Sequence, residues 1–146
     1  MRLWLDCEYN GFRGALISLA LVADDGREFY EVLPCHDPEP WVAEHVMPRL
    51  GKALICRPRT DPRAVLALKL QEFLMQFDRA HIVADWPEDI SHFCSALVVG
   101  SGVRVNTPPL TRELRPDLTG TADVSAMPHN ALEDARALAR AGSAAS

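Results

Sequence analysis

The sequence predicts a single α/β domain, and three observations support that prediction. The chain has 146 residues, 48% of them hydrophobic and 24% charged, which suits one buried core and argues against a disordered chain. Short apolar runs typical of buried strands occur first in succession and then in alternation with helical patterns. The turns between the first three runs are short, which favours an antiparallel meander.

The first three strands are expected near the N-terminus. Residues 3–5 form an apolar run that stops at an acid. Residues 15–23 are almost continuously apolar and end in the turn sequence Asp-Asp-Gly. Residues 27–32 alternate between polar and apolar side chains, which is typical of a strand with one buried face.

Helices and strands are expected to alternate in the middle of the chain. Apolar spacing predicts a helix over 41–50, and a second helix begins at Pro62, where Asp61 can cap the first turn. A short buried strand is expected at 81–84, followed by a helix over 87–97 that also begins at a proline.

The last third of the chain is predicted to hold one strand and one helix. The strand is expected at 103–105, and residues 107–127 read as a long ordered loop because they show little periodicity. The final helix is expected from about 130 to 140. Residues 1–141 are therefore interpreted as one domain, and residues 142–146 as a disordered tail.

Composition limits the classes of function. The formal charge is −5, whereas most nucleic-acid-binding domains present a basic face. The four cysteines form no CxxC pair, which argues against a zinc site built on such pairs. The sequence has no apolar run of the roughly 18 residues that a membrane span needs. An acid at position 6 interrupts any apolar signal segment, so we expect a cytoplasmic protein.

Two acids follow the first predicted strand at alternate positions. Asp6 and Glu8 point to the same face of an extended chain. Two like charges side by side are unfavourable unless a cation lies between them, and Mg²⁺ and Mn²⁺ prefer carboxylate oxygens. In isolation the pattern also fits ordinary surface acids, but its position at the end of a buried strand favours a metal site.

Two further sets of polar residues stand near the starts of helices. Asp85 ends the strand at 81–84, and Asp89 lies early in the next helix, where acids also serve as ordinary partners of the helix dipole. His129 precedes the last helix and Asp134 falls inside it, so their functional groups can flank one site. Histidine can accept a proton near neutral pH, and capping of the helix is the alternative role.

In this order the three sets resemble the motifs of the DEDDh 3′-5′ exonucleases, the family that contains RNase T, oligoribonuclease and the proofreading subunit of bacterial DNA polymerase. Residues 6–12, Asp-Cys-Glu-Tyr-Asn-Gly-Phe, resemble the first motif. Residues 129–135, His-Asn-Ala-Leu-Glu-Asp-Ala, resemble the third motif, His-x-Ala-x-x-Asp-Ala. The resemblance covers residues 3 to about 140 and implies an RNase H-like fold, with a mixed five-stranded sheet flanked by helices.

The second motif departs from the family pattern, which usually has an asparagine four positions before the acid. Asp85 occupies the asparagine position if Asp89 is the metal ligand. The family also has an aromatic residue three positions after the acid, whereas His92 stands there and Phe93 follows it. The spacing favours Asp89, with Asp85 as the alternative.

The resemblance implies hydrolytic removal of nucleotides from the 3′ end of single-stranded nucleic acid, with two ions of Mg²⁺ or Mn²⁺. It implies four carboxylate ligands: Asp6, Glu8, Asp89 and Asp134. His129 would accept the proton of the attacking water. RNA is modestly preferred over DNA as the substrate, because the chain resembles the small RNA-trimming enzymes. A catalytically silent RNase H-like binding module is the alternative, and it would require the loss of one of these groups.

The resemblance also implies a substrate-binding segment and a homodimer. The terminal nucleotide would lie against four residues of the first motif: Tyr9, Asn10, Gly11 and Phe12. One of their aromatic rings would offer a stacking surface. Related enzymes are often homodimers, and residues 41–50 are the candidate contact. The three tryptophans are expected to be packing residues: Trp4, Trp41 and Trp86, the last of which lies next to the proposed site in the sequence.

Overall fold

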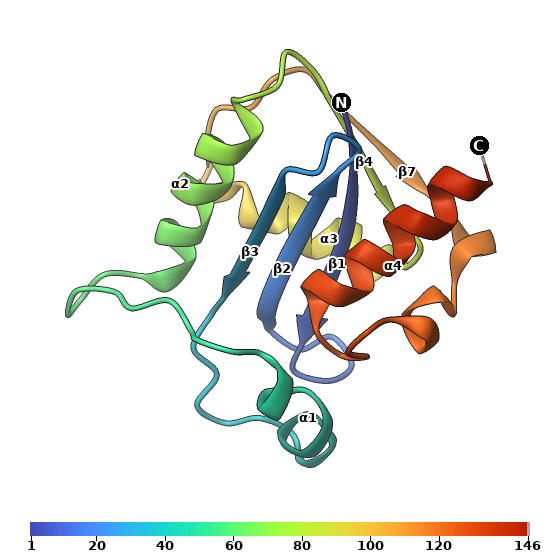
Figure 1. Cartoon of the computed structure of the whole chain (residues 1–146). Coiled ribbons are helices and arrows are strands. Elements are labelled where there is room, and N and C mark those ends of the chain that lie inside the picture. The colour runs from blue at the N-terminus through green and yellow to red at the C-terminus, as the bar shows by residue number, and fades with distance from the viewer. Residues whose placement is uncertain (146) are drawn as a thin grey trace.

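A mixed five-stranded sheet forms the centre of the structure, a computed structural model that describes residues 1–145 (Figure 1). Its strands are β1 (Arg2–Tyr9), β2 (Leu16–Ala23), β3 (Glu28–Val32), β4 (Ala80–Ala84) and β7 (Leu110–Leu114). Their order across the sheet is β3-β2-β1-β4-β7. The first three strands are antiparallel neighbours, whereas β4 runs parallel to β1 and β7 runs parallel to β4. The predicted α/β class, mixed sheet and antiparallel meander are confirmed.

Helices cover both faces of this sheet (Figure 1). α2 (Pro62–Leu74) and α3 (Pro87–Ala96) cover one face and α4 (Ala131–Ala144) covers the other, while α1 (Pro40–His45) lies beyond one end of the sheet. Alternation along β1 sends Leu3 and Leu5 to the core beneath α2 and α3, and Trp4 to the core beneath α4. Within residues 1–145, no helix has the length and apolar character needed to cross a membrane.

The fifth strand of the sheet is β7, which lies in the segment predicted to be a loop. The strand predicted at 103–105 belongs instead to a separate hairpin of β5 (Val98–Gly100) and β6 (Val103–Arg104). β7 lies at the edge of the sheet, so its side chains are half-buried or exposed and it needs no apolar run. After β7 the chain forms two short 3₁₀-helices, η2 (Pro116–Leu118) and η3 (Thr121–Val124).

The helix predicted at 41–50 is interrupted. α1 ends at His45, and a 3₁₀-helix, η1 (Met47–Arg49), follows it. Pro48 explains the break, because proline has no N–H to donate and its ring hinders a continuous α-helix.

The last helix is longer than predicted. α4 continues four residues past the expected end at 140, and its Gly142 packs against the buried ring of Trp4, where a Cβ would lie 1.9 Å from the ring. Residues 142–144 of the predicted disordered tail are therefore helical. The part of that prediction that concerns Ser146 lies outside the described residues.

Candidate active site

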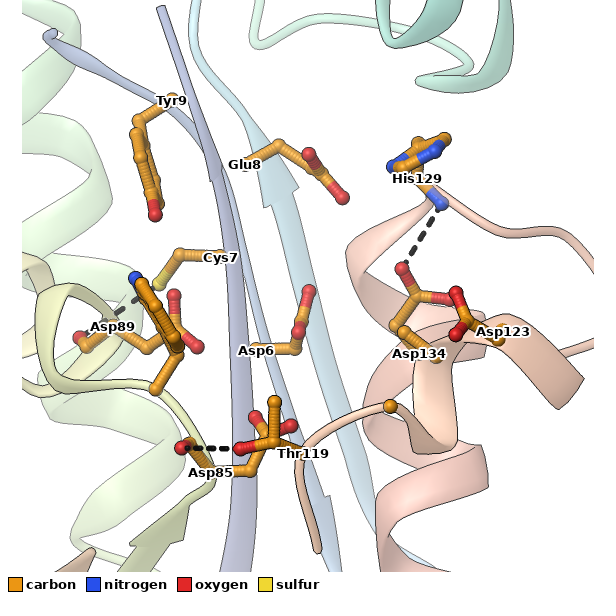
Figure 2. Close-up of a pocket in the computed structure, with 13 residues that line it drawn as sticks. Asp6, Cys7, Glu8, Tyr9, Asp85, Asp89, Thr119, Asp123, His129 and Asp134 are labelled. Carbon is orange, nitrogen blue, oxygen red and sulfur yellow. Dashed lines mark hydrogen bonds between the residues drawn. The ribbon is translucent and has the colours of Figure 1, made fainter. Parts of the chain in front are cut away.

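The acids of the first motif lie toward the C-terminal end of β1. Asp6 and Glu8 share one side of the strand, the side that faces Asp134 of α4 (Figure 2). Cys7, between them, belongs to the core on the opposite side, under α2 and α3. Alternation in an extended backbone thus places two carboxylates side by side on the sheet, as the sequence predicts.

Asp6 belongs to two sets of clustered carboxylates. In the first set, one oxygen from each of Asp6, Glu8 and Asp134 lies within 4.8 Å of the others. A second set with the same spacing consists of Asp6, Asp85 and Asp89. Separations of this size allow one cation to contact all three groups of a set. β1, α3 and α4 therefore bring together all four predicted ligands, which are Asp6, Glu8, Asp89 and Asp134. Asp85, the residue after β4, lies with them.

The second set contains both alternatives for the second motif. Asp85 directly follows β4, and Asp89 lies in the first turn of α3 and is only 2% exposed. The chain turns at Pro87 between them, which brings both side chains to Asp6. The spacing in the sequence favours Asp89, but the fold brings a carboxylate oxygen of each of the two acids within 4.8 Å of one of Asp6.

His129 stands beside the first set (Figure 2). Its φ of 67° lies in the left-handed region, which histidine adopts more readily than most residues, and its N–H donates to Oδ2 of Asp134 at 3.0 Å. The ring of Trp41 packs edge-on against the imidazole, with 5.1 Å between ring centroids. Burial, with the nearby Arg49 and His45, lowers the pKa of His129. The neutral imidazole, which can accept a proton, therefore prevails at neutral pH.

Burial and mutual repulsion raise the pKa values of the clustered carboxyl groups. Chiefly through burial, the pKa of Glu8 rises to about 8 and that of Asp134 to about 6. Burial and then repulsion from neighbouring acids raise the pKa values of Asp6 and Asp89, and burial raises that of Asp85. Such groups can all be ionised together only if positive charge compensates them.

The oxygen atoms of this cluster suit hard divalent cations. Mg²⁺ and Mn²⁺ prefer carboxylate ligands, which make up both sets. Oδ2 of Asp6, the residue common to the two sets, is buried and has no hydrogen-bond partner among residues 1–145. Burying a carboxylate oxygen without a hydrogen-bond partner is unfavourable unless a cation or a water molecule contacts it. The residues present therefore fit a pair of divalent cations.

A cavity of about 380 Å³ opens over the carboxylates. Thr119 and Asp123, which belong to none of the predicted motifs, line its wall together with the predicted residues. Thr119 Oγ1 donates to the backbone oxygen of Asp85 at 3.3 Å (Figure 2). No local pattern marks these two residues, because the segment reaches the site only after β7 has joined the sheet.

Two of the tryptophans predicted to be packing residues reach the site instead. Trp86 is 48% exposed and lines the carboxylate cavity, and its indole N–H donates to Glu88 at 3.2 Å. Trp41 is 52% exposed and contacts His129. Trp4 alone is fully buried, as expected. Trp86 directly follows Asp85 in the sequence, which places it next to the proposed site, as noted above.

Two of the predicted substrate-binding residues line a second cavity, of about 240 Å³, next to the first. Tyr9 and Gly11 share its wall with Trp41 and His129. Gly11 has a φ of 72°, and a Cβ built there would lie 2.1 Å from a carboxylate oxygen of Glu39. The left-handed backbone therefore favours glycine at this position, whereas the close contact is with the flexible end of Glu39, which can shift.

The other two predicted substrate-binding residues do not line either cavity. Asn10 holds the loop in place: its Nδ2 donates to the backbone oxygen of Asp37 at 2.9 Å, and its Oδ1 accepts from the N–H of Glu39 at 2.7 Å. Phe12 is 81% exposed at the tip of the loop, with the Arg13 guanidinium 5.1 Å from its ring centroid.

Fold and site together define a class of protein. A mixed α/β sheet carries, at the end of its first strand, a carboxylate cluster suited to divalent cations. A histidine suited to accept a proton lies beside the cluster. Such an arrangement can support metal-assisted hydrolysis, for example of a phosphodiester.

Comparison with known proteins identifies the family within this class. No family model matches the chain. The chain is 34% identical to the 3′-5′ exoribonuclease Rv2179c of Mycobacterium tuberculosis (strain ATCC 25618 / H37Rv), over 93% of this chain and 88% of that protein. The 3′-5′ exoribonuclease MT2234.1 of strain CDC 1551 / Oshkosh matches to the same extent. The chain belongs to the family of these 3′-5′ exoribonucleases, which confirms the predicted relationship to 3′-5′ exonucleases.

Proposed function

We propose that this protein is a 3′-5′ exonuclease of the DEDDh type, with an RNase H-like fold, that removes nucleotides from the 3′ ends of single-stranded RNA. The observation that carries this proposal is the sharing of Asp6 between two sets of carboxylates, with His129 beside one of them. The names of the two relatives support RNA, rather than DNA, as the preferred substrate.

The carboxylates would hold two divalent cations. Asp6, Glu8 and Asp134 form the site for one ion, and Asp6, Asp85 and Asp89 form the site for the other. When bound, the two ions polarise the scissile phosphate and lower the pKa of the attacking water. Their charge would nearly cancel that of the ionised carboxylates, which allows an anionic phosphate to approach.

His129 would accept the proton of the attacking water. Its lowered pKa keeps the imidazole neutral at neutral pH, as a base requires. Its backbone bond to Asp134 and the edge of Trp41 hold it at the wall that the two cavities share.

The second cavity suits the 3′-terminal nucleoside. Tyr9 and Trp41 contribute aromatic rings to its wall, on which a base can stack. Glu8 lines both cavities, so it can accept a hydrogen bond from the terminal sugar while it faces the cations. Phe12 and Arg13, at the tip of the loop, offer a stacking platform to the next nucleotide.

The experiment compares single-stranded RNA and DNA of one sequence, each labelled at its 5′ end, in Mg²⁺ or Mn²⁺. We expect stepwise shortening from the 3′ end, faster for RNA, and its loss in EDTA. A variant carrying both Asp6→Asn and Asp134→Asn should be inactive. Cleavage that persists in this variant would contradict the proposal. Binding of RNA without any cleavage by the native chain would instead favour a silent binding module.

A further inference from the structure

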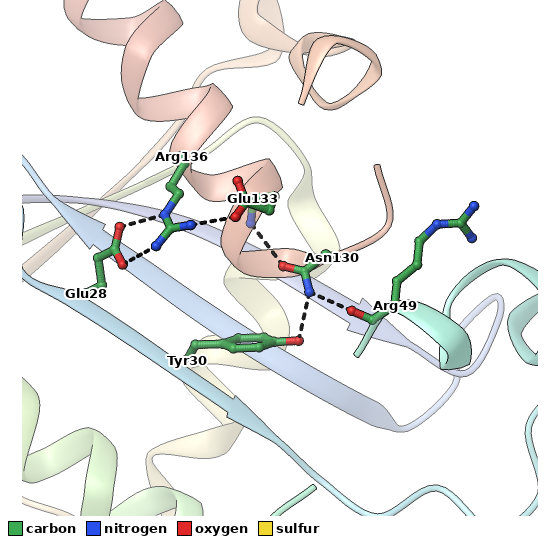
Figure 3. Close-up of polar contacts among 6 residues, drawn as sticks. All are labelled: Glu28, Tyr30, Arg49, Asn130, Glu133 and Arg136. Carbon is green, nitrogen blue, oxygen red and sulfur yellow. Dashed lines mark hydrogen bonds and ion pairs between the residues drawn. The ribbon is translucent and has the colours of Figure 1, made fainter. Parts of the chain in front are cut away.

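Asn130 uses both ends of its side-chain amide to join three elements (Figure 3). It is 9% exposed, and its Oδ1 accepts from the backbone N–H of Glu133 at 3.1 Å, which caps α4. Its Nδ2 donates to the backbone oxygen of Arg49 in η1 at 2.7 Å and to the hydroxyl of Tyr30 in β3 at 3.3 Å. A helix cap needs only the oxygen, so the bonds from the nitrogen serve another purpose.

The two partners of Nδ2, Arg49 and Tyr30, both connect to the segment that contains η1. The hydroxyl of Tyr30 donates in turn to the backbone oxygen of Leu50 at 2.8 Å, so Leu50 is bonded to the sheet and Arg49 to the N-cap of α4. α1 lies just before this segment, and its Trp41 packs against the imidazole of His129. Asn130 therefore joins the α1–η1 segment to the turn that carries the proposed base.

The turn at His129 needs such support. The left-handed backbone of this residue is unfavourable for an L-amino acid and persists only where its surroundings hold it. On one side, the bond to Asp134 fixes its N–H. On the other side, Asn130 follows directly and is held by η1 and β3.

We propose that Asn130 is a positioning residue for the hydrolytic reaction. Through its bonds to Arg49 and Tyr30 it fixes the α1–η1 segment against the turn at His129, and so holds the imidazole where it can take a proton from water. This inference rests on the proposed function of His129. Asn130 lines neither of the two cavities described above, so it acts through its neighbour.

Two substitutions separate the cap from the positioning role. Asn130→Asp keeps an oxygen for the N–H of Glu133, and aspartate caps helices as well as asparagine does. It has no N–H to donate to Arg49 or Tyr30. Asn130→Ala removes the cap and the ties together.

Arg136→Met is the matched control. Arg136 lies on α4, and its Nη2 contacts Oε2 of Glu28 in β3 at 2.6 Å (Figure 3). It also contacts Glu133, and it lines neither cavity. This substitution therefore loosens the same helix from the same strand without touching the turn at His129.

The experiment measures the melting temperature, kcat and KM of each variant on single-stranded RNA in Mg²⁺, with and without His129→Asn. We expect Asn130→Asp and Asn130→Ala to lower kcat by similar factors, roughly 10- to 100-fold, as for loss of a supporting contact. Arg136→Met should lower the melting temperature but not kcat. In the His129→Asn background, the Asn130 variants should cause no further loss, because the group that they position is absent.

Three results would overturn the inference. A native kcat in Asn130→Asp would show that the cap is the whole contribution of Asn130. An equal loss with and without His129→Asn would show that Asn130 does not act through His129. A native kcat in His129→Asn alone would remove the proposed base, and the inference with it. The third result contradicts the proposed function as well, whereas the first two leave that function intact.

Discussion

The backbone N–H of His129 donates a hydrogen bond to Oδ2 of Asp134, with 3.0 Å between nitrogen and oxygen. The residue proposed to accept a proton is thereby tied to a residue proposed to hold a cation. The bond uses the main chain, so the imidazole remains available to the cavities that it lines. A substitution at position 129 therefore removes the base and keeps the bond.

His129→Asn should impair turnover without impairing cation binding. Asparagine adopts the left-handed backbone readily, so the turn should persist. We expect kcat to fall by about 10²- to 10⁴-fold, the usual contribution of a general base. Calorimetric titration with Mn²⁺ should be unchanged. His36→Asn, at an exposed histidine in a loop, is the control and should retain native turnover. Native kcat in His129→Asn would contradict the proposed role.

Asp6→Asn should weaken both cation sites together, because Asp6 belongs to both sets. Titration of the native chain with Mn²⁺ should resolve two binding events, and the variant should lose affinity at each. Asp78→Asn makes the same chemical change at an exposed acid outside the two site cavities, and it should titrate like the native chain. If Asp6→Asn retains one site of native affinity, the two ions do not share this carboxylate.

Asp85→Asn and Asp89→Asn should each weaken one cation site and leave the other. Each substitution removes one ligand from the second set but none from the first. We expect the exonuclease rate to fall at least tenfold, roughly the loss seen when groups that support a metal site are removed. If Asp85→Asn binds Mn²⁺ and degrades RNA like the native chain, Asp89 acts as a cation ligand without Asp85.

Without cations, the fold should lose stability as the pH rises. The pKa of Glu8 is about 8 instead of 4.5, and that of Asp134 about 6 instead of 3.8. The folded state therefore holds these protons more tightly than the unfolded state. The resulting stabilisation is fully present at a pH below the pKa values of the unfolded chain, and it is lost as the pH rises through the pKa values of the folded protein.

The corresponding measurement is the melting temperature in EDTA, which should fall between about pH 4 and pH 8. Glu8→Gln should flatten the upper part of this fall. Mg²⁺ at a hundredfold excess over its Kd should restore about 2.7 kcal/mol of stability for each site filled. A melting temperature that rises with pH across this range would contradict the prediction.

Gly142→Ala should destabilise the fold. Its Cβ would lie 1.9 Å from Cη2 of Trp4, a fully buried ring. Alanine gains about 1 kcal/mol over glycine inside a helix, whereas overpacking a core costs about 1–3 kcal/mol, and a rigid ring cannot yield easily. Denaturant unfolding should therefore show a net loss. Ser143→Ala, at an exposed position of the same helix, should be neutral or slightly stabilising. A gain in Gly142→Ala would show that the ring moves aside.

Local patterns predicted most of the fold, and the exceptions have physical causes. Buried strands such as β1 and β4 carry apolar runs, and the helices begin at prolines and capping residues, so both can be predicted from the sequence. β7 cannot be predicted from local patterns, because an edge strand with half-buried and exposed side chains needs no apolar run. Trp41 and Trp86 were misinterpreted because burial of a large ring depends on what packs over it.

The sequence by itself determined where the acids stand: at the ends of apolar strands and in the first turns of helices, in the order of the exonuclease motifs. Tertiary structure decided which acids meet. A carboxylate oxygen of Asp85 and one of Asp89 both lie within 4.8 Å of one of Asp6, because sheet pairing brings segments far apart in sequence to one strand end. Burial at that point raises the carboxyl pKa values, and the pattern of single residues does not contain that property.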